Sequence, residues 1–211
     1  MVTVVVLAKE PVAGRVKTRL CPPYSPEQAA DLARAALADT IATVDAWAPD
    51  ATLCALDGEP GDWLPATWTV RPQRAGNLGD RIAGAFDDAA ALSNGPVLLI
   101  GMDTPQICAA DLSAAATALE DADAVLGAAA DGGWWLLGLH HPDASLVTGI
   151  PTSRSDTGAR QRARLVEHGL RVADLPVLHD VDTADDAELV AGLAPNTRFA
   201  AIVRRLNAAV A

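Results

Sequence analysis

Short apolar runs alternate with segments of helical periodicity along this chain. The first run, Val2–Ala8 (VTVVVLA), is continuous and rich in β-branched residues, which is typical of a strand buried on both faces of a parallel sheet. The alternation predicts an α/β protein of three layers, with helices on both faces of a mainly parallel, twisted sheet. The expected strands are Val2–Ala8, Ala51–Leu56, Thr67–Arg71, Pro96–Gly101, Ala124–Ala129, Trp134–Leu139 and Val172–Leu178.

The intervening segments predict the helical layers. Ser25-Pro26-Glu27-Gln28 is a capping sequence, and apolar residues then recur at helical spacing as far as Val44. The other expected helices are Leu78–Ala91, Ala109–Leu119, Asp156–His168, Ala184–Leu193 and Arg198–Val210. In sheets of this kind, ligands bind at the carboxyl ends of the strands, so polar motifs that follow strands are candidates for one common site.

Composition limits the partners that we expect. With 211 residues and no linker or repeat, residues 1–211 are expected to form one domain. A net charge of −11 makes nucleic acid an improbable partner, and no apolar stretch is long enough to span a bilayer. Three widely spaced cysteines (Cys21, Cys54 and Cys108) fit a reducing compartment, so we expect a cytoplasmic protein.

A basic loop follows the first strand. Ala8–Leu20 contains Lys9, Arg15, Lys17 and Arg19, and the two lysines are the only ones in the chain. A compact ammonium at these positions suits phosphate oxygens, and Gly14 lets the backbone approach a ligand closely. We expect this loop to bind nucleotide phosphates; the alternative is a solvated basic loop that balances an acidic protein.

An aspartate stands at the end of another buried strand. In Gly101-Met102-Asp103-Thr104-Pro105, the carboxylate of Asp103 follows the strand and precedes a proline turn. Hard divalent cations prefer carboxylate oxygen and also bind phosphate, so Asp103 is a candidate ligand of Mg²⁺ or Mn²⁺. The alternative is that Asp103 only caps a helix or forms a turn.

Five motifs in order resemble one family. KEPVAGRVKTRL, GNLGDRIAGAF, GMDTP, DGGWWLLGL and DVDTADDAEL are similar to those of a bacterial group of GT-A-like transferases, often labelled glycosyltransferase. The resemblance runs from about Val2 to Val190 and extends to molybdenum-cofactor guanylyltransferases and, more distantly, to 2-phospholactate guanylyltransferases. It implies a GT-A-like fold. The glycine-rich first loop usual in sugar nucleotidyltransferases is absent here.

The resemblance also implies a second metal carboxylate, Asp182, in Asp180-Val181-Asp182-Thr183. Asp180 and Asp182 are two residues apart, so their side chains share a face in an extended segment, and a cation would relieve their repulsion. Whether Asp180 also binds metal stays open. Thr183 is a candidate helix cap.

Two glycine-rich segments complete the candidate site. Gly76-Asn77-Leu78-Gly79 opens a helix, and its free backbone N–H groups are suited to a base or a phosphate. By resemblance to guanylyltransferases, Asn77 and Arg81 are nucleotide-binding candidates, although Arg81 could equally form a surface ion pair. The family's acceptor side corresponds to Asp131, Gly132, Gly133 and Trp134; of the tandem tryptophans, at most one lines a site and the other is core.

Three functions remain open. In a nucleotidyltransferase, a small anionic acceptor attacks an NTP, Asp103 and Asp182 hold Mg²⁺, and Lys17, Arg15 and Arg19 stabilise the leaving pyrophosphate. In a GT-A-type glycosyltransferase, the same cation holds the diphosphate of a nucleotide sugar. A non-catalytic nucleotide-binding module is the third. The Asp-Thr-Pro turn, which lacks the second aspartate of Asp-x-Asp, favours the first.

Overall fold

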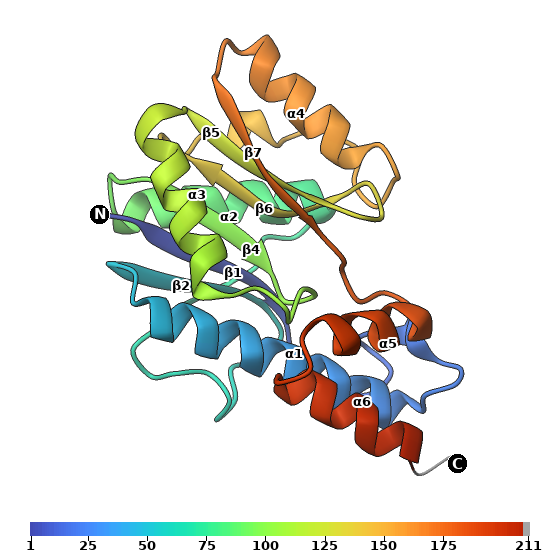
Figure 1. The fold of residues 1–211 in the computed structure, drawn as a ribbon. Helices are drawn as coiled ribbons and strands as arrows, with labels where there is room; N and C mark the ends of the chain where they lie inside the picture. Colours follow the sequence, from blue (N-terminus) through green and yellow to red (C-terminus); the bar gives the residue numbers. More distant parts are fainter. Residues whose placement is uncertain (209–211) are drawn as a thin grey trace.

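A seven-stranded sheet forms the middle layer of the computed structural model, which describes residues 1–208 (Figure 1). The strands stand in the order β3-β2-β1-β4-β6-β5-β7, and only β6 runs antiparallel to its neighbours. Their bounds are β1 Thr3–Lys9, β2 Ala51–Asp57, β3 Thr69–Pro72, β4 Val97–Gly101, β5 Ala124–Ala129, β6 Trp134–Leu139 and β7 Val172–Leu178. The mainly parallel sheet predicted from the sequence is therefore confirmed.

The outer layers are helical. The helices are α1 Pro26–Trp47, α2 Leu78–Leu92, α3 Ala109–Asp121, α4 Thr157–Glu167, α5 Ala184–Leu193 and α6 Arg198–Ala208, with short 3₁₀ turns η1 Thr18–Leu20 and η2 Ala144–Leu146. Helices α1 and α3 cover one face of the sheet, and α2 and α4 cover the other (Figure 1). No helix among residues 1–208 has the length and apolar character needed to cross a membrane.

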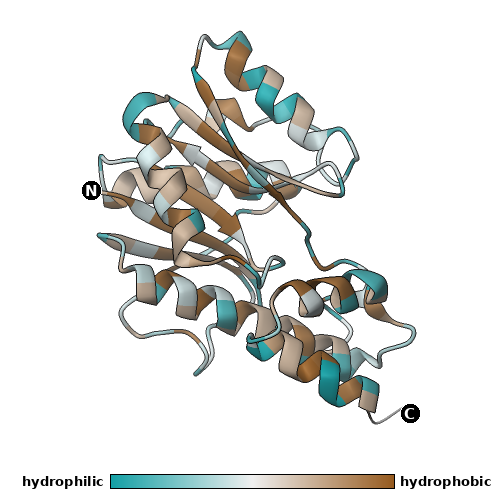
Figure 2. Ribbon diagram, viewed as in Figure 1, coloured by the Kyte–Doolittle hydropathy of each residue, from teal (hydrophilic) through white to brown (hydrophobic). Residues whose placement is uncertain are grey.

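The alternation of side chains along the strands fills both cores. In β1, Val4 and Val6 pack under α1 and α3, whereas Val5 packs under α2, and all three are fully buried. Figure 2 shows the result: the strands are largely brown, while the helices carry hydrophilic residues on their outer sides. The continuous apolar run in the sequence thus reflects a strand with two buried faces.

Strand β6 is reversed for a simple geometric reason. Only residues 130–133 separate β5 from β6, and a parallel crossover needs a dozen or more residues. The hairpin turn therefore lies at the same edge of the sheet as the carboxyl ends of β1 and β4. Asp131, in this turn, is brought to the edge at which the parallel strands present their loops.

A third apolar cluster packs the segment after β1 and helix α1 against the segment after β7 and the C-terminal helices. Leu20 and Tyr24, from the loop after β1, pack with Val181 and Phe199 beside the first half of α1. Helix α6 lies against α1, and α5 packs against α6 (Figure 1). This packing holds the basic loop next to the segment that follows β7, although the two are about 160 residues apart in sequence.

The predicted boundaries differ from the observed ones by a few residues. The third strand spans Thr69–Pro72 where Thr67–Arg71 was expected, because Thr67 and Trp68 belong to the preceding turn. Helix α4 starts at Thr157 and α3 continues to Asp121. The predicted last helix reaches Val210; α6 is described to Ala208, and the two residues beyond it lie outside the described residues.

Candidate functional site

Two neighbouring cavities open at the carboxyl edge of the sheet. The larger has a volume of about 400 Å³ and lies between α2, the β5–β6 turn and the loop before α4. The smaller, of about 270 Å³, lies against the basic loop. Arg19, Asp103 and Asp182 line both cavities, so the two spaces meet at the two predicted metal carboxylates. The arrangement offers one basic compartment and one larger compartment with carboxylates between them.

Lys17 connects the basic loop to both carboxylates. Its Nζ lies 2.6 Å from Asp103 Oδ1 and 3.5 Å from Asp182 Oδ1, and it also donates to the carbonyl oxygen of Val181. The Lys17 side chain is only 9% exposed, and its backbone adopts a left-handed conformation with φ 49°. In this state the ammonium occupies the position between the two carboxylates that the sequence assigned to a metal.

The other basic residues of the loop line the smaller cavity. Arg19 contacts Asp182 Oδ2 at 3.1 Å, while Lys9 lies 3.8 Å from Asp57. Arg15 is exposed in the cavity wall. Gly14 lines neither cavity; its φ of 76° is a conformation that favours glycine, and a Cβ there would meet nothing within 4 Å. Three cations in addition to Lys17 thus face the space in which phosphates are predicted to bind.

Asp103 is positioned by a short turn tied to the end of β7. Its carbonyl oxygen accepts the Val181 N–H at 2.9 Å, and the Gln106 amide donates to the His179 carbonyl. Thr104 is 3% exposed, and neither its hydroxyl nor the side-chain oxygen of Gln106 has a hydrogen-bond partner among residues 1–208. Two buried polar atoms of this turn therefore lack partners within the described residues, which is uncommon in folded proteins.

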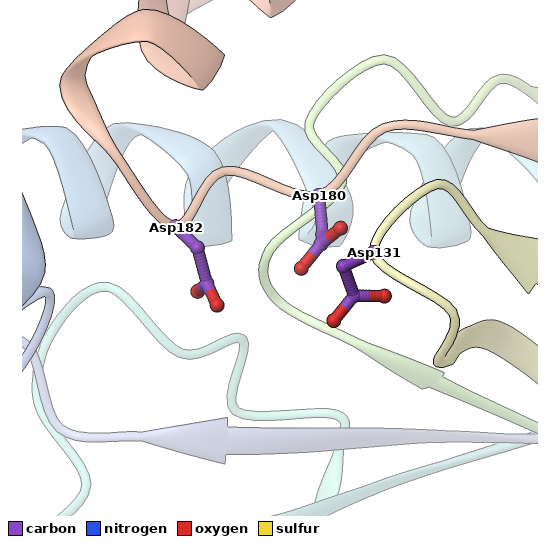
Figure 3. A group of neighbouring side chains, drawn as sticks. All are labelled: Asp131, Asp180 and Asp182. Carbon is purple, nitrogen blue, oxygen red and sulfur yellow. The ribbon is translucent and has the colours of Figure 1, made fainter. Parts of the chain in front are cut away.

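Asp131 joins Asp180 and Asp182 in an acidic cluster (Figure 3). One oxygen from each carboxylate lies within 4.8 Å of the others. Burial, then the charge of Asp131 and then that of Asp182, raises the pKa of Asp180 to about 6, although its own backbone N–H and Lys17 oppose the rise. Asp131 is itself oriented by the Gly133 N–H, which donates to Oδ1 at 2.7 Å. The sequence placed Asp131 on the acceptor side and did not predict this third carboxylate.

Backbone contacts between the β5–β6 turn and the start of α4 build one side of the larger cavity. The Gly158 N–H donates to the Gly132 carbonyl at 2.8 Å, and a Cβ on Gly132 would lie 2.0 Å from the Ser155 oxygen. Gly133, Trp134 and Trp135 all border this cavity. Trp135 is only 3% exposed and packs in the core under α1 and α3, whereas Trp134 packs against the core on the other face of the sheet. Which tryptophan contacts an acceptor stays a prediction.

Asn77 and Arg81 lie outside both cavity walls. Asn77 caps α2 through a capping box with Asp80, and Arg81 pairs with Asp57 at 2.8 Å. Their exposed neighbour Leu78 lines the larger cavity instead, together with Leu7 and the buried residues Ile82 and Leu99. These apolar lining residues have no distinctive signal in the sequence, because core-facing residues of the same strands and helix look identical.

Of the basic residues around α4, only Arg154 reaches the larger cavity. Arg160 pairs with Asp156, Arg162 pairs with Asp174, and Arg164 donates to two loop carbonyls. Thr183 caps α5 through a capping box with Asp186, as the sequence predicts. The Thr183 cap fixes the start of the helix immediately after Asp182.

Comparison with solved structures confirms the fold. A structure from Desulfovibrio desulfuricans G20, provisionally named a nucleotide-diphospho-sugar transferase, is similar with a TM-score of 0.89 and 25% identity, covering 98% of this chain and 95% of that one. The 2-C-methyl-D-erythritol 4-phosphate cytidylyltransferase from Thermus thermophilus has a TM-score of 0.58 and 16% identity, covering 92% and 100%. A manganese complex of Rv0371C from Mycobacterium tuberculosis H37Rv has a TM-score of 0.54 and 18% identity, covering 92% and 98%.

These likenesses establish the predicted three-layer fold of nucleotide-diphospho-sugar transferases and cytidylyltransferases. The relation to molybdenum-cofactor guanylyltransferases stays a prediction. A search of curated proteins gives no match. A family model does match residues 28–154, more than half of the sequence, and the chain therefore belongs to DUF2064, a family described as uncharacterised proteins conserved in bacteria.

Proposed function

We propose that this protein is a divalent-cation-dependent nucleotidyltransferase, which moves a nucleoside monophosphate from an NTP to a small anionic acceptor and releases pyrophosphate. The observation that carries the proposal is the convergence on Lys17. Lys17 of the basic loop contacts both Asp103 and Asp182, which come from the two acidic turns, and the three residues lie where the two cavities meet. Groups separated by 164 residues in the sequence are thus brought to one point.

The smaller cavity suits the phosphates of the donor. Lys9, Arg15 and Arg19 surround it, and Lys17 lies at its inner end. As the acceptor oxygen bonds to the α-phosphorus, the bond to the bridging oxygen of the β-phosphate breaks, and negative charge grows on the leaving pyrophosphate. The loop cations would stabilise that charge in place, since preorganised charge is the main source of rate in phosphoryl chemistry of this kind.

The carboxylates between the cavities fit a hard divalent cation. Asp103 and Asp182 offer oxygen ligands only, and they are close enough to share one ammonium. Mg²⁺ or Mn²⁺ held there would neutralise phosphate oxygens. Because Lys17 takes this position in the structure, its ammonium would have to turn toward the phosphates when a cation enters, a movement that a long flexible side chain allows.

The larger cavity suits the acceptor. Its volume of about 400 Å³ is within the range for small-molecule sites, and Arg154 supplies a cation at its rim. Asp131, Gly132, Gly133 and Trp134 belong to this side in the proposal. Positioning the acceptor against the α-phosphate requires no protein nucleophile, because the acceptor itself carries the attacking oxygen.

Glycosyl transfer from a nucleotide sugar is the second candidate. It is favoured by the provisional name of the Desulfovibrio structure, which shares 25% of its residues with this chain. The two candidates use the same phosphate and cation groups and differ in the bond that breaks. In the second, the sugar leaves the diphosphate and a nucleoside diphosphate is released.

The released product separates the candidates. The protein is incubated with Mg²⁺, each NTP or nucleotide sugar, and a panel of phosphorylated and carboxylic acceptors. Pyrophosphate release that requires an acceptor and is lost in Asp103→Asn supports nucleotidyl transfer. Nucleoside diphosphate release supports glycosyl transfer, and nucleotide binding without turnover across the panel would leave a binding module as the function.

A further inference from the structure

The acidic cluster is unevenly neutralised. Lys17 and Arg19 both contact Asp182, whereas neither Asp131 nor Asp180 forms a salt bridge with any basic group of residues 1–208. In Figure 3 the Asp180 and Asp131 side chains lie next to each other and face the same space as Asp182. Two neighbouring carboxylates without a cation repel each other, so this end of the cluster is short of positive charge.

The spacing of the three carboxylates fits one cation. Their nearest oxygens lie within 4.8 Å of one another. Ligand oxygens stand about 2.0–2.6 Å from Mg²⁺ or Ca²⁺, so two ligands of the same ion can be up to about twice that distance apart. The three aspartates come from two separate segments, the β5–β6 turn and the segment after β7, and both segments are held by backbone hydrogen bonds.

Thr104 supplies an independent indication of a ligand. This residue lines the same cavity as the three aspartates, is 3% exposed, and its hydroxyl has no partner among the described residues. A buried hydroxyl left without a partner is destabilising, so a partner in the cavity is expected. A cation or one of its bound waters is such a partner.

The position between Asp103 and Asp182 is a different one. The Lys17 ammonium fills that position, and it makes no salt bridge with Asp131 or Asp180. A cation at the outer end of the cluster would therefore share only the Asp182 carboxylate with Lys17, and the contact between Lys17 and Asp103 would stay intact.

We propose that Asp131, Asp180 and Asp182 bind a second hard divalent cation, and that this site fills in the absence of nucleotide. Three carboxylates leave positions of an octahedral ion open toward the larger cavity. Oxygen atoms of an acceptor, such as those of a carboxylate or a phosphate, are the chemical class that would complete it. This acceptor role rests on the proposed function; the binding of the cation does not.

Mn²⁺ alone is the probe, because its free form is counted directly by electron paramagnetic resonance. Wild-type protein without nucleotide is titrated with Mn²⁺ at pH 7.5, and we expect one ion to bind. Asp131→Asn is expected to weaken this binding by about tenfold or more, since even groups that only support a ligand contribute that much. Asp180→Asn should do the same, so the conclusion does not depend on the folding of a single variant.

Two further variants test the location. Asp103→Asn should retain the ion, because Asp103 belongs to the other position. Asp185→Asn, an equal loss of charge three residues from Asp182 at an exposed site, should retain it as well. A wild-type protein that binds no Mn²⁺ without nucleotide, or an ion that is lost in Asp103→Asn and kept in Asp131→Asn, would overturn the proposal.

The failure of the proposed function would look different. If the protein binds Mn²⁺ through Asp131 but releases no pyrophosphate with any NTP, the proposed nucleotidyltransferase function is wrong and the proposed cation site still stands.

Discussion

At the scale of single residues, the observed conformation of Lys17 carries two energetic costs. A left-handed backbone is unfavourable for a side chain with a Cβ, by roughly 1–2 kcal/mol, and its ammonium is almost withdrawn from water. Contacts with Asp103, Asp182 and the Val181 carbonyl offset both costs. The conformation is thus held by the groups that, in our proposal, bind the cation and the phosphates.

The substitution Lys17→Ala is expected to weaken the binding of an NTP much more than the binding of the corresponding nucleoside. Affinity for an NTP should fall by about 10- to 100-fold, because a hydrogen bond to a charged group contributes about 1.5–3 kcal/mol. Affinity for the corresponding nucleoside, which has no phosphate, should change little. Isothermal titration calorimetry with both ligands measures the two effects, and an equal loss for both would make the loop structural.

Asp180 gives a prediction about pH. Its folded pKa of about 6 is above the ordinary value of 3.8, so the folded protein disfavours the ionised form. The resulting cost is absent below about pH 4, grows as the pH rises toward 6, and is complete above it. Without divalent cations, Asp180→Asn should therefore stabilise the protein at pH 7.5, by about 1–2 kcal/mol after allowance for solvent screening.

Urea unfolding in EDTA at pH 7.5 and at pH 4 checks the sign. The stabilisation by Asp180→Asn should shrink toward zero at the lower pH. A variant that is less stable than wild type at pH 7.5, or a difference that does not depend on pH, would contradict the assigned environment of this carboxyl.

At the scale of elements, the hairpin turn before β6 and the start of α4 depend on glycine. A Cβ on Gly158 would lie 2.4 Å from the Gly133 carbonyl oxygen. Gly158→Ala should therefore push the two loops apart and destabilise the fold by about 1–3 kcal/mol. Gly192→Ala, in α5, meets nothing within 4 Å and serves as the matched control. Equal unfolding free energies for the two variants would show that the loops are not in contact.

At the scale of the whole molecule, Asp39 ties the C-terminal helices to α1. Its carboxylate is 8% exposed and accepts the backbone N–H groups of Arg198 at 3.0 Å and of Phe199 at 2.8 Å. Asp39→Ala should lose about 2–4 kcal/mol of stability, since it leaves buried donors without a partner. Asp31→Ala removes an exposed contact with Arg205 between the same two helices and should cost less than about 1 kcal/mol.

Chemical denaturation of both variants measures the difference. Similar losses would contradict the view that the buried Asp39 fixes α6. Because α5 and α6 pack with Val181, a loosened Asp39 variant should also bind Mg²⁺–nucleotide more weakly.

The sequence predicted the candidate site best where a charged residue directly follows a strand. Asp103 and Lys17 lie at the carboxyl ends of adjacent parallel strands, β4 and β1, so the fold class alone predicts that they approach each other. Asp182 follows β7, at the far edge of the sheet, and reaches them through the third apolar cluster. The resemblance to a family predicted that meeting; periodicity alone does not.

Other features depended on contacts that no local pattern records. Asp131 meets Asp180 because β6 is reversed, which places the hairpin turn at the ligand edge. Arg81, on α2, pairs with Asp57 at the end of β2, and it does not line either cavity. The position of the Lys17 ammonium between two carboxylates likewise arises from long-range packing.

The central claim is that Asp103 helps to hold a cation against nucleotide phosphates that the basic loop binds. Thermal unfolding of wild type and Asp103→Asn with an NTP, with and without Mg²⁺, tests it directly. At a ligand concentration about 100 times Kd, binding adds about 2.7 kcal/mol, or roughly 5–10 °C in Tm. We predict that Mg²⁺ enlarges the NTP-dependent rise in wild type and has no such effect in Asp103→Asn, whose Tm without ligand stays close to that of wild type. The same Mg²⁺-dependent rise in both proteins would contradict the claim.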